Sequence, residues 1–117
     1  MRHGFNTPRL ARKWFYSAAT PEADVARYAA MIGNESQRVA LDTVRQNALR
    51  PERVTTPFLV LGAALDACIT ESEVHDTARA YGTEPEIIAG IGHNMMLDTG
   101  WAAVAERIHS WLGGRGL

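Results

Sequence analysis

Cysteine is nearly absent from the sequence, in which Cys68 is the only one. A single cysteine forms no intrachain disulfide and offers no cysteine-based zinc framework, so we expect the fold to depend on its hydrophobic core. Long hydrophobic runs are absent as well. The longest ones, such as the stretch from Phe58 to Leu65, fall far short of the ~20 residues needed to cross a bilayer. We therefore expect no transmembrane segment.

Neither sign of charge dominates the sequence. Lys and Arg together number 12 and Asp and Glu 13, which gives a formal net charge of -1 and no global basic field to attract nucleic acid or an anionic membrane. The first residues, Met1 to Pro8, lack the apolar core of a signal peptide, so we expect a cytoplasmic location. The size and the hydrophobic content suit one small globular domain.

Helix signals dominate the first half of the chain. Thr7-Pro8 is typical of an N-cap followed by a proline at the first helical position, and it predicts a helix toward Ala19. Thr20-Pro21 repeats the signal and predicts a second helix that ends at Gly33. The apolar positions of this second helix follow helical spacing: Val25, Tyr28, Ala29 and Ile32. A third helix is predicted over Glu35 to Leu49, so residues 1–52 form a helical segment.

The second half, residues 53–117, predicts a strand-helix-strand-helix order. Phe58 to Leu61 is a short, continuous apolar run of the kind seen in buried parallel strands. A capping box of Thr70 and Glu73 opens a helix that ends near Gly82, and Glu86 to Ala89 forms a second strand. A last helix from about Trp101 to Leu112 is expected to bury one face, made of Trp101, Val104, Ala105, Ile108 and either Trp111 or Leu112.

Two polar residues follow the predicted strands. Asp66 comes after the first strand and His93 after the second, at the sheet edge where binding and chemistry collect in open α/β folds. Each also has a simpler interpretation, because loop aspartates often bind backbone amides and a histidine is often a structural hydrogen-bonding residue. Cys68 lies near Asp66 in the sequence. We interpret it as a small buried hydrophobe and not as a nucleophile.

The sequence predicts no metal site and no cofactor. The four histidines show no H-x-x-x-H or similar ligand spacing: His3, His75, His93 and His109. Gly90-Ile91-Gly92 lacks the third glycine of a dinucleotide-binding loop, so it predicts none. Met95 and Met96, like the aromatic residues Trp14, Phe15 and Tyr16, either line an acyl pocket or belong to the core, and apolar residues at helical spacing favour the core.

Two segments resemble the α/β-hydrolase family. Pro57 to Asp66 is similar to the strand that delivers the acid of the catalytic triad, and Gly90 to Asp98 resembles the catalytic-histidine loop before the closing helix. The helices of residues 1–50 resemble the end of a cap. The resemblance implies an α/β fold class, as the C-terminal part of an α/β-hydrolase with an incomplete sheet. It also implies Asp66 as orienting acid, His93 as general base, and an ester or related acyl substrate.

The nucleophile of such a triad is missing from the sequence. A nucleophile elbow needs a G-x-S-x-G turn, and no serine occupies one: Ser17, Ser36, Ser72 and Ser110. We therefore expect a fragment or truncated form that is inactive alone. Since one neighbouring strand cannot pair both edges of a buried strand, we expect the chain alone to be marginally stable, to dimerise, or to need the missing segment from a complementing chain. The alternative is a non-catalytic interaction protein that pairs its exposed sheet edge with itself or with another chain.

Overall fold

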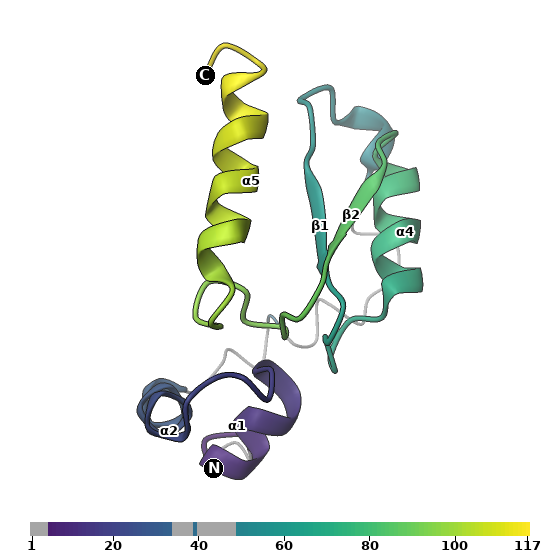
Figure 1. Ribbon diagram of the computed structural model, residues 1–117. Helices are drawn as coiled ribbons and strands as arrows, with labels where there is room; N and C mark the ends of the chain where they lie inside the picture. The colour runs from purple at the N-terminus through teal and green to yellow at the C-terminus, as the bar shows by residue number, and fades with distance from the viewer. Residues whose placement is uncertain (1–4, 34–38, 40–48) are drawn as a thin grey trace.

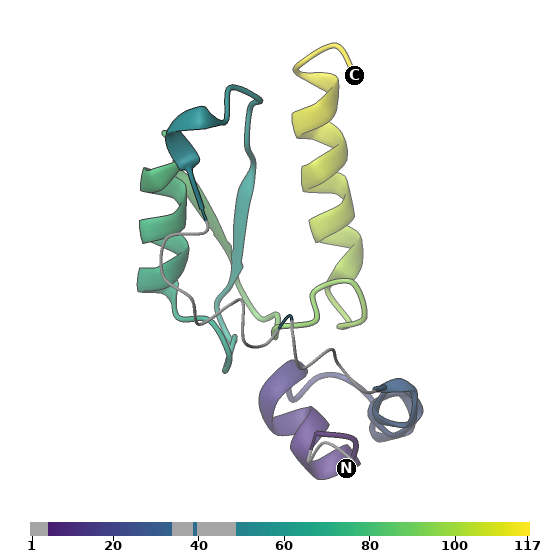
Figure 2. The same cartoon turned by 180° about the vertical axis from the view of Figure 1, so that it is seen from behind.

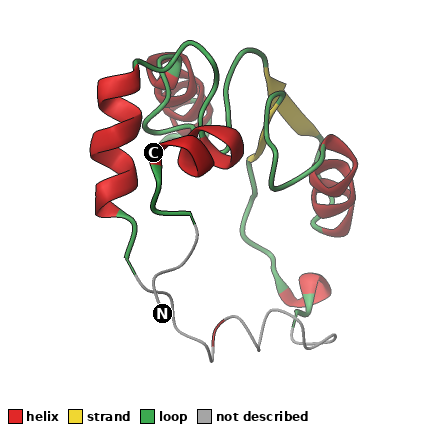
Figure 3. Ribbon diagram, turned by 90° about the horizontal axis from the view of Figure 1, so that it is seen from below, coloured by secondary structure: helices red, strands yellow, loops and turns green. Residues whose placement is uncertain are grey.

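The computed structural model describes residues 5–33, 39 and 49–117. Within this part a small parallel sheet of two strands, β1 (Val60–Ala63) and β2 (Pro85–Ile88), lies between helices α4 (Glu71–Ala80) and α5 (Trp101–Gly113), as Figures 1 and 2 show. The strands pair in register from Val60 opposite Pro85 to Ala63 opposite Ile88. The predicted α/β class is confirmed. Helices and loops make up more of the described chain than the sheet does, as the view from below in Figure 3 shows.

Helix α4 covers one face of the sheet through Val74 and Ala78, which are both buried. The approach is close because Gly62 has no side chain. A Cβ there would lie 2.7 Å from Ile87 Cδ1 and 3.0 Å from both γ carbons of Val74. The capping box that opens α4 is confirmed: Thr70 Oγ1 accepts the Glu73 N–H, and the Glu73 carboxylate accepts the Thr70 N–H at 2.7 Å.

Helix α5 lies on the other side of the strands and is held mainly near its start. Val104 packs into a small cluster with Ala63 and Ile91, and the Arg107 guanidinium forms an ion pair with Glu86 of β2. The wide apolar face predicted for α5 is wrong. Trp101 is 55% exposed, Ile108 is 41% exposed, and Ala105 is exposed, because a sheet of two strands is too narrow to cover more than the Val104 stripe. Trp111 and Leu112 are half-buried.

Helices α1 (Pro8–Phe15) and α2 (Glu22–Met31) pack against each other beyond the ends of the strands (Figure 1). Their shared core consists of buried residues on both helices and the segment that follows α1: Ala11, Tyr16, Val25 and Ala29. Arg12 stabilises the connection, since its guanidinium donates to the carbonyls of Ser17 and Thr20 at 2.9 and 2.7 Å and pairs with Glu22 at 2.9 Å.

The predicted bounds of the first helices need correction. Helix α1 ends at Phe15 instead of Ala19, because Tyr16 turns to extended backbone and the Ser17 N–H leaves the helix to bind Asp98. The N-cap of α2 is Pro21 and not Thr20, since the Pro21 carbonyl accepts the first helical N–H groups. The third predicted helix, from Glu35 to Leu49, falls almost wholly outside the described residues.

The strands are also displaced from their predicted positions. β1 starts two residues after Phe58 and includes Gly62 and Ala63, while β2 starts at Pro85, one residue early. The register explains the first shift, because Phe58 would have to pair with residue 83, which still belongs to the turn after α4. The Phe58 ring instead stacks on Tyr81, with 4.4 Å between the ring centroids. No helix in the described ranges is long and apolar enough to cross a bilayer.

Candidate functional site

Asp66 occupies the loop that leaves β1, and its carboxylate organises that loop. Oδ1 accepts the backbone N–H groups of Cys68 and Ile69 at 2.7 and 2.9 Å, and the side chain is only 8% exposed. Asp66 therefore binds backbone amides, as loop aspartates often do. These bonds fix the carboxylate in one orientation and leave Oδ2 free to face the second loop.

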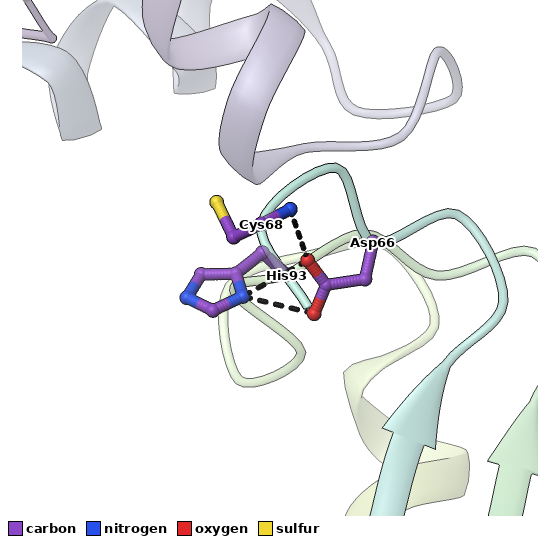
Figure 4. Close-up of side chains that lie close together, drawn as sticks. All are labelled: Asp66, Cys68 and His93. Atoms are coloured by element: carbon purple, nitrogen blue, oxygen red, sulfur yellow. Dashed lines mark hydrogen bonds and ion pairs between the residues drawn. The ribbon is translucent and has the colours of Figure 1, made fainter. Parts of the chain in front are cut away.

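His93 occupies the loop that leaves β2, and its ring faces Asp66 (Figure 4). Nδ1 lies 2.9 Å from Asp66 Oδ2 and 3.1 Å from Oδ1. This geometry suits the tautomer in which Nδ1–H donates to the carboxylate and Nε2 keeps its lone pair. The His93 side chain is 35% exposed, so part of the ring remains open to solvent.

The two loops meet because the pairing of the strands continues past their ends. The Ala64 N–H donates to the Ile88 carbonyl at 2.9 Å, and the Leu65 N–H donates to the Ile91 carbonyl at 3.0 Å. These bonds bring the backbones together immediately before Asp66 and His93. The expectation that both residues collect at one sheet edge is confirmed.

The charge state of Asp66 follows from its contacts. Partial burial raises the pKa of Asp66, but the hydrogen bonds from Ile69, His93 and Cys68 outweigh that effect and lower the pKa below its ordinary value of 3.8. A carboxylate that remains charged at neutral pH orients the imidazole and stabilises any positive charge that develops on it.

The end of α1 lies over the site. The Phe15 ring packs against the His93 ring at 5.8 Å between centroids, and the Phe15 carbonyl accepts the Asn94 N–H at 2.9 Å. A Cβ on Gly92 would lie 2.9 Å from the Ser17 nitrogen and 2.9 Å from the Tyr16 carbonyl carbon, so only glycine permits this approach. The N-terminal helices thus position the histidine loop directly.

Asp98 joins the same two segments, and sequence reasoning missed it. It is completely buried and accepts the Ser17 N–H at 2.8 Å, the Ser17 hydroxyl at 2.7 Å and the Gly92 N–H at 3.1 Å. Burial raises its pKa, but the hydrogen bonds from Ser17, Gly92 and Thr99 outweigh burial and lower the pKa to about 2. The only signal in the sequence was an aspartate shortly before a predicted helix, which is common without such a role.

Cys68 was also misplaced by the sequence interpretation. The prediction of a buried hydrophobe is wrong, because Cys68 is exposed and its thiol donates to the Trp14 carbonyl at 3.4 Å. Partial desolvation and the Asp66 carboxylate raise the pKa of the thiol, which argues against a nucleophilic role. Its Sγ nevertheless belongs to a cluster in which one donor atom each from Asp66, Cys68 and His93 lies within 4.8 Å of the others (Figure 4).

The described serines do not complete the site. Ser17 is bound to Asp98, Ser72 lies in the exposed first turn of α4, and Ser110 donates to Glu106 on α5. Ser36 lies outside the described residues. No described serine hydrogen-bonds to His93.

An open apolar hollow of about 360 Å³ borders His93. Residues from β1, the histidine loop and α5 line it, among them Leu61, Met95, Met96, Trp101 and Ile108. Met95 is half-buried and packs against the Val104 cluster, whereas Met96 is 68% exposed, so assigning both methionines to the core is wrong for Met96. The face of His93 toward α5 is thus apolar.

No protein-family model, curated protein or solved structure matches this chain.

Proposed function

We propose that this chain carries the acid and the histidine of a serine-hydrolase triad, as the C-terminal part of an α/β-hydrolase that cleaves carboxylic esters or related acyl compounds. The observation that supports this most is the contact of His93 Nδ1 with both oxygens of Asp66, at 2.9 and 3.1 Å, across the ends of two adjacent parallel strands. The order of the two residues in the chain and their resemblance to the family's segments agree with it.

The proposed chemistry uses each residue in one role. Asp66, with its lowered pKa, is charged at neutral pH and holds the Nδ1 proton. The Nε2 lone pair of His93 then accepts the proton of a serine hydroxyl as it attacks the acyl carbon, and the imidazolium later protonates the leaving group. In this proposal the serine and the oxyanion donors come from a complementing chain, because no serine of the sequence lies in a G-x-S-x-G turn, and the chain alone is inactive. The hollow beside His93 receives the apolar part of the substrate.

Complementation tests this proposal. The chain is mixed with an N-terminal portion of an α/β-hydrolase that carries a nucleophile elbow, and hydrolysis of a short-chain aryl ester is followed. We expect activity only in the mixture, with His93→Ala lowering kcat by at least about 1,000-fold because the general base is lost. His75→Ala is the matched control, since His75 is an exposed histidine on α4. Activity that His93→Ala leaves intact would overturn the proposal.

A second candidate function is binding of another chain through the sheet edge. In the described part β1 pairs with β2 on one edge and with no strand on the other. Beside this edge lies a second open hollow of about 380 Å³ between the start of β1 and the end of α5, lined by Phe58, Leu61, Ile108 and Trp111 among others. Unpaired strand edges with exposed apolar neighbours are typical of surfaces that bind a further strand. A defined complex, detected by size-exclusion chromatography and by a pull-down, would support this function.

A further inference from the structure

The cluster of Asp66, Cys68 and His93 contains three kinds of metal ligand. A carboxylate oxygen, a thiol sulfur and an imidazole nitrogen converge from two loops, all within 4.8 Å of one another. Two of the three residues lie two positions apart after β1, and the third follows β2. The histidine spacing of the sequence could not reveal this set, because the donors are of mixed type and 27 positions separate the histidine from the aspartate.

From this cluster we propose a zinc site in which Asp66, Cys68 and His93 supply three ligands and a water molecule completes a tetrahedron. Zinc binds sulfur at about 2.3 Å and nitrogen or oxygen at about 2.0–2.2 Å, so its ligand atoms lie about 3.3–3.8 Å from one another. The donors of the cluster therefore need to move by roughly an ångström to bind the ion. Three protein ligands with one open position are typical of accessible zinc centres.

The surroundings of the cluster favour binding of a divalent ion. The backbone N–H groups of Cys68 and Ile69 bind Asp66 Oδ1, which leaves Oδ2 as the ligand oxygen and fixes its position. The carboxylate therefore loses little rotational freedom when the ion binds. Cys68 is exposed and His93 is partly exposed, which gives the ion a path from solvent. The Asp66 carboxylate and a Cys68 thiolate together neutralise the two charges of the ion.

Zinc binding changes the protonation of two ligands, Cys68 and His93. The Cys68 thiol loses its proton to solvent and the sulfur forms the bond to zinc. The His93 proton moves from Nδ1 to Nε2, so that Nδ1, which faces Asp66, binds the ion. One proton is released for each zinc ion bound, with no oxidation or reduction. The occupied site also breaks the Asp66–His93 hydrogen bond, and the resulting loss of hydrolysis is the only consequence that rests on the proposed function.

Direct binding measurements test the site without reference to hydrolysis. The untagged, metal-free full chain is titrated with Zn²⁺ by calorimetry in two buffers of different ionisation enthalpy, and separately with Co²⁺ while the thiolate-to-cobalt absorption band is recorded. We expect one ion per chain, release of about one proton because a single thiol ionises, and a cobalt band of tetrahedral intensity.

Substitutions decide which residues bind. Cys68→Ser abolishes the thiolate band, and both Cys68→Ser and His93→Ala weaken zinc binding more than about tenfold, since even an outer-shell partner of a ligand is typically worth that much. His75→Ala and His109→Ala, which change exposed histidines outside the cluster, bind as the unmodified chain does. Circular dichroism verifies that each variant is folded. The zinc site is refuted if the unmodified chain binds no stoichiometric zinc, or if folded Cys68→Ser and His93→Ala retain full affinity.

Discussion

At the scale of single residues, Asp98 connects the N-terminal helices to the histidine loop. It accepts N–H groups from Ser17 and from Gly92, the residue before His93. Hydrogen bonds from several donors stabilise the charged form of a buried carboxylate. The charged form of Asp98 therefore helps to hold the histidine loop against the segment that follows α1.

The ionisation of Asp98 predicts an acid-labile contribution to stability. Its pKa is lowered from 3.8 to about 2 on folding, so the contribution is complete above the unfolded value and is lost as the pH falls through the folded value. The shift corresponds to about 2 kcal/mol. Urea denaturation between pH 6 and pH 2 measures it, and we expect the free energy of unfolding to decline below about pH 4.

Comparison with Asp98→Asn isolates this residue from the other acidic groups whose pKa is lowered, Asp66, Glu73 and Glu86. The gap in stability between the unmodified chain and the variant is expected to close as the pH approaches 2. Asp76→Asn serves as the control, because its ion pair with Arg79 is exposed and contributes little. A gap that stays constant over this range would contradict the assigned ionisation.

At the scale of elements, the capping signal in the sequence predicts the start of α4 correctly but the start of α2 incorrectly. Thr70 and Glu73 satisfy each other's backbone N–H groups, so the α4 signal needs no tertiary partner. Thr20 is also a threonine before a predicted helix, but it lies in the turn between α1 and α2, where the Arg12 guanidinium donates to its carbonyl. The Thr20 hydroxyl is then buried without a hydrogen-bond partner among the described residues.

A buried hydroxyl without a partner costs stability, so Thr20→Val is expected to stabilise the chain. Valine has nearly the same shape and carries no polar group to desolvate, and we expect a gain of about 1 kcal/mol. Chemical denaturation measures the change. Thr77→Val on α4 is the control, since Thr77 is exposed, and it should change stability by no more than about 0.5 kcal/mol. Loss of stability in Thr20→Val would show that the hydroxyl has a partner.

At the scale of the whole molecule, the apolar surface between β1 and α5 is the main feature left uncovered. Both hollows share Leu61 and Ile108, so the open surface is continuous along the side of β1 that faces α5. The described part buries only nine hydrophobic residues, of which four form one cluster and three form another, and it leaves Trp101 and Ile108 accessible. Surfaces of this kind favour association.

We expect the chain to self-associate through this surface. Sedimentation at increasing concentration should show a rising average mass, and Ile108→Glu should weaken association at least about tenfold, because a buried, unpaired charge at the contact costs more than the 1.4 kcal/mol that a tenfold change represents. His109→Glu, the adjacent exposed residue that lines neither hollow, is the control. A monomer at every concentration, or equal effects of the two substitutions, would argue against association at this surface.

The sequence by itself determined those features that local chemistry controls. The capping box of α4 and the start of α5 at Trp101 were predicted correctly, because each depends on residues a few positions apart. The proximity of Asp66 and His93 was also predictable, since the ends of neighbouring parallel strands share one edge. Their catalytic roles remain a prediction.

Only the tertiary structure decided the features that depend on distant contacts. Asp98 binds Ser17 across 81 positions, Cys68 joins a cluster with His93, and α5 stays largely exposed because the sheet beneath it is narrow. Periodicity and capping describe a residue relative to its own element, whereas these contacts depend on how the elements pack. For the same reason, the proximity of Asp66 and His93 could be predicted from the order of strands and loops. The role of Asp98, the buried carboxylate that binds the histidine loop, could not be predicted in this way.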